Sequence, residues 1–155
     1  MAENWPGWRG PGGDGISSER NLATRWSDTE NIAWKTSIGG EGHSSPVVWE
    51  DRIFLTTSLT EENERRLLCL NRLDGETLWE REVVRSPPES IHRLNSRASG
   101  TPATDGQRVY VTFRVGDDIV VAAHDLASGK QLWLVRPGTH AGEWGFSNSP
   151  VLYKD

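Results

Sequence analysis

The sequence predicts an all-β fold built from a repeated unit of about 50 residues. Residues 42–58 match residues 98–114, since both contain small polar residues, Ser/Thr-Pro, a short strand, an acidic turn and a longer alternating strand. Residues 69–80 match residues 123–134 in the same order. Two matched halves in a constant order define a unit of four antiparallel strands, which has the size of a blade in a β-propeller.

The second copy carries the clearest strand pattern. We expect its strands at 101–104, 108–115, 119–125 and 130–136, because apolar and polar residues alternate with a period of two, most regularly in 108–115. The sequence GDD at 116–118 links the second and third of these strands as a tight hairpin. No stretch of the chain shows a 3.6-residue apolar period, so no helix is predicted.

The first copy has a longer hairpin loop. We expect strands at Ile53–Ser58 and Arg66–Asn71, joined by an acidic loop at Thr60–Arg65. Gly75 and Gly129 occupy equivalent places in the turns that end the two copies, where a residue with positive φ is required.

The repeat divides the chain into six segments. They are a Trp/Gly/Pro-rich N-terminal strap (1–29), an orphan outer strand of a closing blade (30–38), blade 1 (43–84), a loop (85–99), blade 2 (100–136) and the first strand of blade 3 (146–155). Ser149-Pro150 repeats the Ser/Thr-Pro pair for a third time, and Trp34 in its segment corresponds to Trp79 in blade 1. We therefore expect an incomplete propeller, whose unpaired end strands make it a poor folding unit by itself.

Composition narrows the class of protein. The 155 residues include 35% hydrophobic residues and eight tryptophans, as expected of a packed chain. A net charge of −5 argues against nucleic acid and anionic membranes, and no apolar run reaches the roughly 20 residues of a membrane helix. Cys69 is the single cysteine and lies in an apolar run, which predicts a buried thiol and excludes an internal disulfide. The chain as given shows no signal peptide after Met1.

The turn of blade 2 carries a recognisable motif. Ala123, Asp125, Gly129 and Trp133 have the spacing Ala-x-Asp-x-x-Thr-Gly-x-x-x-Trp, with Ser128 at the threonine position. This pattern resembles the pyrroloquinoline-quinone (PQQ)-like β-propeller repeat. The resemblance implies a ring of seven or eight blades, of which this chain would be about a third.

The turn of blade 1 departs further from this motif. Cys69, Asn71 and Asp74 replace the alanine, aspartate and threonine, while Gly75 and Trp79 are kept. The opening residues also resemble the start of exported bacterial propellers of this kind, which implies a periplasmic or extracytoplasmic location.

The resemblance also assigns structural roles. In this family the tryptophans dock one blade onto the next, so Trp34, Trp79 and Trp133 are expected to be docking residues, with Gly75, Gly129 and Asp125 in the turns. Burial of one aromatic side chain removes about 150–250 Å2 from water, and we expect Trp79 and Trp133 to be mostly buried.

We do not expect a catalytic, cofactor-binding or metal-binding site in this segment. Quinoproteins of this fold hold PQQ with a calcium ion, use an aspartate as base and often carry a vicinal disulfide. This chain has one cysteine and no carboxylate–asparagine set that matches the calcium ligands, so we predict no catalytic residue, cofactor site or metal site, and no PQQ-dependent dye reduction. PQQ and calcium remain possible only if further blades supply the site. Asp117-Asp118 lies in a hairpin and is interpreted as structural, and 10–15 (GPGGDG) lacks the Lys-Ser/Thr of a P-loop.

The connection between the two blades is the best candidate for binding. It is longer than the connection after blade 2, and most of the excess lies in 85–99. Long loops on a rigid β-scaffold commonly carry binding residues, although a plain linker is the alternative. His43, His92 and Asn95 are the candidate residues; His140 also lies near a crossover, and surface histidines without a metal-binding role are the alternative for all three histidines.

Three functions fit these observations. The first is a non-catalytic propeller scaffold that binds a protein or polymer through its loop face, the second a PQQ-dependent alcohol or sugar dehydrogenase, and the third a sensor domain fused to a signalling kinase. Fold does not decide among them. Because this segment lacks a recognisable quinone site, the scaffold is the prediction.

Overall fold

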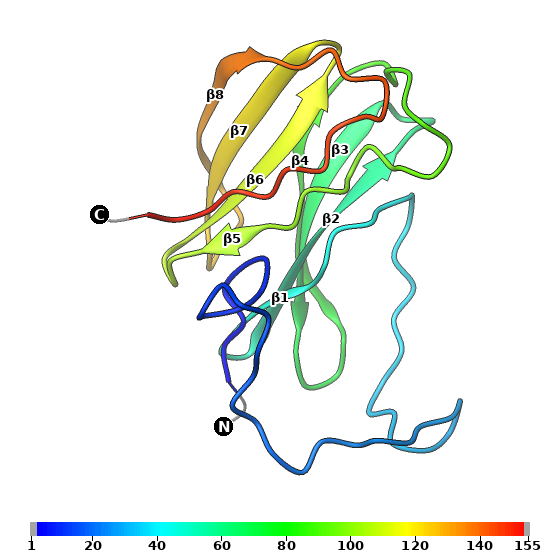
Figure 1. Ribbon diagram of the computed structural model, residues 1–155, viewed down its shortest axis with the longest axis vertical. Coiled ribbons are helices and arrows are strands. Elements are labelled where there is room, and N and C mark those ends of the chain that lie inside the picture. The colour runs from blue at the N-terminus through cyan, green and yellow to red at the C-terminus, as the bar shows by residue number, and fades with distance from the viewer. Residues whose placement is uncertain (1–2, 154–155) are drawn as a thin grey trace.

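The protein forms two four-stranded antiparallel sheets, which lie side by side in the computed structural model of residues 3–153 (Figure 1). The first sheet, blade 1, contains β1 (Val47–Trp49), β2 (Arg52–Leu59), β3 (Glu64–Asn71) and β4 (Thr77–Arg85) in chain order. The second, blade 2, contains β5 (Ala103–Thr104), β6 (Arg108–Val115), β7 (Asp118–Asp125) and β8 (Gln131–Thr139). No helix occurs among residues 3–153, and the predicted all-β fold of four-stranded antiparallel blades is confirmed. Two ends of predicted segments, residues 1–2 of the strap and 154–155 of the third-blade strand, lie outside the described residues.

The hairpin loop of blade 1 is shorter than the sequence predicted. The expected loop Thr60–Arg65 was wrong at its end, because β3 already begins at Glu64, which pairs with Leu59, while Arg65 pairs with Ser58. Arg65 is a charged residue in a fully buried strand position. A 2.8 Å ion pair with Glu89 neutralises its charge, which is why the strand continues through it.

The hydrophobic core lies between the two sheets. Alternate residues of each strand point to one face of a sheet, and this period gives both blades a continuous apolar face. The buried core side chains include Phe54, Leu67 and Cys69 from blade 1 and Val111, Phe113, Val120 and Ala122 from blade 2. The sheets are therefore held together mainly by burial of apolar surface.

The Ser/Thr-Pro pairs link successive units at their first residues. The backbone N–H of Ser45 donates to Thr101 Oγ1 at 3.0 Å, and the N–H of Thr101 donates to Ser149 Oγ at 3.0 Å. A hydroxyl side chain in each repeat thus accepts the backbone N–H of the preceding repeat. This contact explains why a small hydroxyl residue recurs before the proline.

The segments predicted as single end strands are extended but contain no strand. Residues 30–38 and 146–153 carry no strand assignment in the structure. Trp34 donates its indole N–H to the Arg72 carbonyl at 2.9 Å, and the Thr36 hydroxyl donates to the Gly75 carbonyl at 2.8 Å. A strand requires backbone pairing with a neighbour, whereas these two contacts are donated by side chains.

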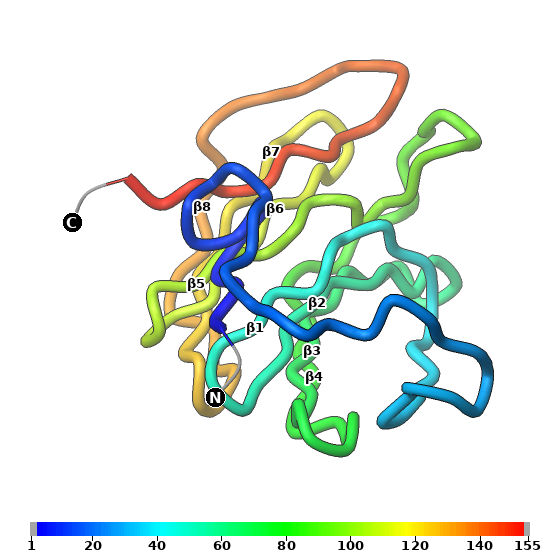
Figure 2. The backbone as a smooth tube through the Cα atoms, turned by 60° about the horizontal axis from the view of Figure 1, so that its bottom comes forward, coloured from blue at the N-terminus to red at the C-terminus, as the bar shows by residue number. Residues whose placement is uncertain are grey.

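The N-terminal strap lies along the first strands of both blades (Figure 2). Trp5 forms an antiparallel bridge with Val48, with N···O distances of 2.8 and 2.9 Å. The carbonyl of Pro6 accepts the N–H of Thr104 at 2.8 Å. The strap therefore satisfies backbone groups on the edges of β1 and β5, which strands at a sheet edge otherwise leave unpaired.

Candidate interaction surface

The turns between the third and fourth strands hold the motif residues. In the turn between β7 and β8, the Asp125 carboxylate accepts the Ser128 N–H at 2.8 Å, and the Gly129 N–H donates to the Asp125 carbonyl at 2.8 Å. Hydrogen bonds from Ser128 lower the pKa of Asp125. Gly129 has a φ of 69° and Gly75, its equivalent in blade 1, has a φ of 76°, in the region where glycine carries no steric cost.

These glycines also make room for tryptophans. A Cβ atom on Gly129 would lie 2.7 Å from the ring of Trp79, and one on Gly75 would lie 2.4 Å from the ring of Trp34. Trp79 is only 7% exposed. Each of these two rings therefore packs on the turn of the blade that follows it in the chain, and the motif glycine is needed for that close approach.

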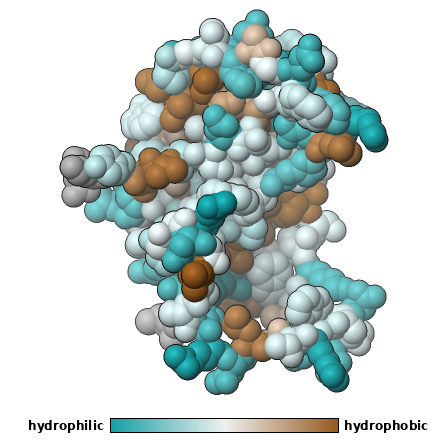
Figure 3. Space-filling model, in the orientation of Figure 1, coloured by the Kyte–Doolittle hydropathy of each residue, from teal (hydrophilic) through white to brown (hydrophobic). Residues whose placement is uncertain are grey.

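Trp133 does not follow this pattern. It is 41% exposed, so the burial that we expected for it is not found. Its ring contacts Tyr110 of the same blade, at 6.1 Å between centroids. Leu132 and Val135 of β8 are exposed as well, and Figure 3 shows apolar side chains gathered over β7 and β8 at the upper left. The tryptophan lacks burial because no described residues form a blade against this face of blade 2.

Two loops meet at the end of the sheets where the even-numbered strands finish. The first is the crossover loop (residues 86–102) between β4 and β5, and the second is the exit loop (residues 140–146) after β8. They lie side by side at the upper right in Figure 1. The rings of His92 and Trp144 are 4.1 Å apart between centroids, and Asn95 Nδ2 donates to the Trp144 carbonyl at 2.6 Å. Loops separated by about 50 residues in sequence thus form one surface.

Large apolar side chains stand out from this surface. Leu94 is 68% exposed and Trp144 is 69% exposed. We define the loop surface as His92, Leu94, Asn95 and Trp144. Two of these residues, His92 and Asn95, were candidates from the sequence, whereas Leu94 and Trp144 were missed. The signal available in the sequence was a tryptophan at position 144, outside the repeated motif.

The other predicted histidines have local roles in the structure. His43 is exposed, and its backbone N–H donates to the carbonyl of Ala98 at 3.1 Å. His140 Nε2 lies 3.2 Å from the carbonyl of Gly145, and its ring meets the ring of Phe146 edge-on. The structure therefore places His43 beside the base of the crossover loop and His140 inside the exit loop, and the hydrogen bonds and ring contacts of both are made with groups other than His92.

Arginines fasten the crossover loop to blade 1. Buried Arg65 pairs with the Glu89 carboxylate at 2.8 Å, and Arg97 donates from Nε and Nη2 to the Glu89 carbonyl at 3.1 and 2.9 Å. Arg97 also pairs with Glu41 at 2.9 Å. Charged donors make stronger hydrogen bonds than neutral ones, so the base of this loop is firmly held.

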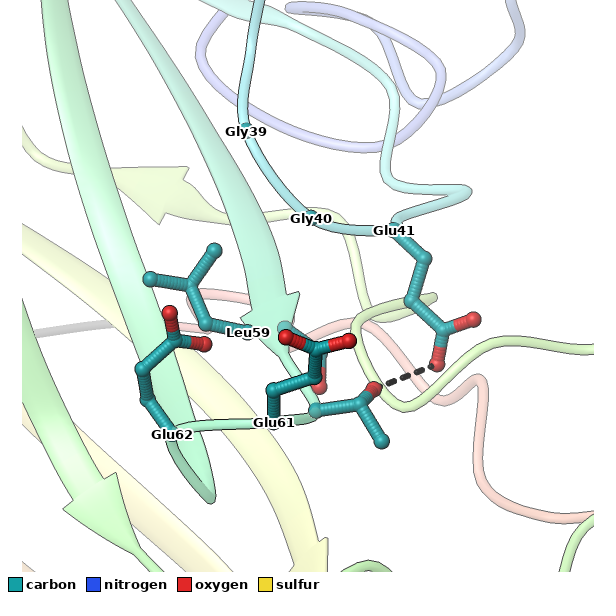
Figure 4. A pocket seen from close by; sticks show the side chains of 8 residues that line it. Gly39, Gly40, Glu41, Leu59, Glu61 and Glu62 are labelled. Atoms are coloured by element: carbon teal, nitrogen blue, oxygen red, sulfur yellow. Dashed lines mark hydrogen bonds between the residues drawn. The ribbon is translucent and has the colours of Figure 1, made fainter.

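An acidic pocket of about 500 Å3 adjoins the base of the crossover loop (Figure 4). Its carboxylates come from Glu41, Glu61 and Glu62, and the Thr60 hydroxyl donates to Glu41 at 3.3 Å. The remaining lining residues are Gly39, Gly40, Ser58 and Leu59. Because Glu41 also pairs with Arg97, the pocket and the crossover loop are linked through one ion pair.

The acidic and sulfur-containing side chains of the described residues do not gather into a metal-ligating cluster. Within residues 3–153, no group of three or more His, Cys, Asp or Glu side chains is placed to hold a metal ion. Of the two hairpin carboxylates, Asp118 lies 3.4 Å from Arg136, and the Asp117 backbone carbonyl accepts the His140 N–H at 2.7 Å. Burial raises the pKa of the Cys69 thiol to about 11, so this sulfur is a core group and not a thiolate ligand.

Comparison with known families identifies the fold. The family model described as outer membrane protein assembly factor BamB matches residues 15–147. The chain belongs to this family. Its resemblance to PQQ-like propeller repeats, inferred from the motif of Gly129 and Trp133, is thereby confirmed.

Comparison with solved structures concerns the fold. BamB from Moraxella catarrhalis superposes with a TM-score of 0.58 at 18% identity, over 78% of this chain and 34% of that one. A europium-containing methanol dehydrogenase gives a TM-score of 0.44 at 19% identity, over 59% of this chain and 15% of that one. The chain thus spans about a third of the length of the BamB structure, and the likeness shows the propeller fold alone. No curated protein matches the sequence.

Within the part of the chain that the structure describes, no helix is long and apolar enough to span a membrane.

Proposed function

We propose that this protein is a non-catalytic β-propeller scaffold that binds a protein partner through its loop surface. The observation that carries the proposal is the pair of exposed apolar side chains, Leu94 and Trp144, on loops fixed to each other and to the blades. Binding energy in protein interfaces concentrates in a few large apolar or aromatic residues, and fixed loops lose little entropy on binding.

The charged side chains around the loop surface indicate a second property of the partner. Exposed carboxylates at this end of the sheets belong to Glu61, Glu62, Asp117 and Glu143. Three exposed arginines lie at the same end, and two of them, Arg85 and Arg136, already pair with carboxylates, while Arg93 is the third. An acidic rim around apolar anchors is complementary to a partner that presents an apolar groove flanked by basic side chains. The family description supports a partner that takes part in outer-membrane protein assembly, and with it an extracytoplasmic location.

The experiment is site-specific photo-crosslinking in cells that express the full-length protein. A photo-reactive residue at position 94 or 144 is expected to crosslink to a component of outer-membrane protein assembly. The matched control is position 73, because Leu73 is an equally apolar, 81% exposed residue in the turn at the opposite end of blade 1. Equal crosslinking from position 73, or none from positions 94 and 144, would contradict the proposal.

A further inference from the structure

Arg114 has an unusual place in blade 2. It lies near the end of β6, where the repeat places Ser58 in blade 1, and it is only 8% exposed. Its guanidinium donates from Nε to the Gly116 carbonyl at 2.7 Å, from Nη1 to the Gly142 carbonyl at 2.8 Å and from Nη2 to the Ser90 carbonyl at 3.4 Å. One side chain thus reaches three loops.

The three carbonyls belong to separate parts of the chain. Gly116 is in the hairpin between β6 and β7, Ser90 is in the crossover loop, and Gly142 is in the exit loop. A guanidinium is a planar fork of five donors with fixed directions, so it fixes the relative positions of the groups that it binds. The ammonium group of a lysine is one point with three donors and cannot reproduce this fork.

We propose that Arg114 is the positioning residue of the loop surface. Ser90 is four residues before Leu94, and Gly142 is two residues before Trp144. By holding both carbonyls, Arg114 sets where the two exposed side chains stand relative to each other. The effect on partner binding rests on the proposed function, whereas the effect on the loops does not.

A merely stabilising role predicts a different outcome. If Arg114 only strengthened blade 2, its loss would loosen β6, β7 and β8 together and leave the loops no more mobile than the strands. A positioning role predicts loosening confined to the crossover and exit loops. Arg65 and Arg97 hold the crossover loop to blade 1 at Glu89, and Arg114 adds the contacts that hold Ser90 and Gly142 to β6 of blade 2.

The test is hydrogen exchange on the full-length protein with R114K. We expect amide exchange in residues 88–95 and 140–146 to become at least about tenfold faster, with the β3 and β7 amides unchanged. Arg136→Lys is the matched control, since Arg136 is a half-exposed arginine of blade 2 that pairs with Asp118, and it is expected to leave both loops unchanged. Unchanged loop exchange in R114K would overturn the proposal.

The affinity of R114K for the crosslinked partner distinguishes the positioning role of Arg114 from the proposed function of the loop surface. A loss of about tenfold in affinity for R114K, with the loops loosened, supports both. Loosened loops with unchanged affinity would leave the positioning role in place and contradict the proposed function of the loop surface.

A measurement on the wild-type protein covers the case in which R114K does not fold. The guanidinium NMR signals of Arg114 are expected as separate, slowly exchanging Nη resonances, because three hydrogen bonds stop rotation of the group. A single averaged Nη resonance would overturn the proposal.

Discussion

Trp79 and Trp133 occupy the same place in two copies of one motif, yet one is 7% exposed and the other 41%. The local chain is alike in both, since each tryptophan lies four residues after its motif glycine. The difference is what lies opposite: Trp79 packs on the turn at Gly129, whereas the described residues place no such turn against Trp133. The motif therefore specifies a docking surface, and burial depends on the neighbouring blade.

A second exposed tryptophan, Trp144, lies in the exit loop at the other end of the sheets. Trp144 belongs to no repeated motif and remains exposed, although its backbone carbonyl and its ring are both held by the crossover loop. Exposure at Trp133 follows from a missing neighbour within the described chain, whereas Trp144 is exposed although its ring and its backbone carbonyl already contact the crossover loop. This contrast is the reason for assigning partner binding to the loop surface and not to the face of β8.

The largest expected loss of stability comes from removing the buried ring of Trp79. Trp79→Ala should lower the free energy of unfolding of the 155-residue chain by about 3–5 kcal/mol, because it leaves a cavity between the blades. Trp133→Ala in the same chain should cost less than about 1 kcal/mol, as expected for a half-exposed side chain. Urea denaturation of both variants checks the comparison, and equal losses would contradict it.

The turn glycines test the same docking contact from the blade that receives the tryptophan. Gly129→Ala should cost about 3 kcal/mol or more, because a Cβ atom in the left-handed region also meets the Trp79 ring at 2.7 Å. Gly116→Ala is the control: its φ is 60°, but a Cβ atom there meets nothing within 4 Å. This variant should cost only the backbone strain, about 1–2 kcal/mol. The two thermal melts should therefore differ, and similar midpoints would refute docking on Gly129.

The interface between the blades should also respond to pH through His124. This ring is fully buried, with Nδ1 2.9 Å from the Gly129 carbonyl, and burial lowers its pKa below the ordinary 6.5. The unfolded chain then binds the proton first, so the contribution of His124 to stability is constant above about pH 6.5 and falls below it, by at most about 1.4 kcal/mol per pH unit.

The variant His124→Asn keeps a donor for the Gly129 carbonyl and removes the titration. Its urea midpoint should change less than that of the wild type between about pH 6.5 and pH 5, a range above the titration of most carboxylates. His43→Asn, at an exposed histidine, is the control and should behave as the wild type does. A His124→Asn variant with undiminished pH dependence would count against this role.

The smallest effect is expected at the hydroxyl contacts between repeats. Thr101→Val removes the acceptor of the Ser45 N–H while keeping the shape of the side chain, which should cost about 1 kcal/mol. Thr101→Ser keeps the hydroxyl and should cost less. A valine variant as stable as the serine variant would show that the recurring hydroxyl has another cause.

The sequence was sufficient for the parts of the fold that depend on local order. Strand 108–115 and the positive φ of Gly75 and Gly129 follow from alternation and turn chemistry, which act within a few residues. The position of Arg65 was missed because a charge favours a loop in sequence, and its partner Glu89 lies 24 residues away. Long-range pairing of this kind leaves no periodic signal.

The candidate site was predicted only in part for the same reason. Loop length drew attention to His92 and Asn95, but the contact of both with Trp144 joins two loops across the whole of blade 2. The sequence contained a usable signal at Arg114. The repeat aligns this arginine with Ser58 of blade 1, at a strand position that is buried in both blades. A charged residue at such a position indicates fixed hydrogen-bond partners.

The most direct test of the account is the affinity of the full-length protein for the crosslinked partner, measured by titration calorimetry. The double variant Leu94→Ala, Trp144→Ala should bind at least about 100-fold more weakly than the wild type, because it removes both apolar anchors. Leu73→Ala, at the opposite end of blade 1, should bind as the wild type does. Wild-type affinity in the double variant would contradict the assignment of the loop surface as the binding face.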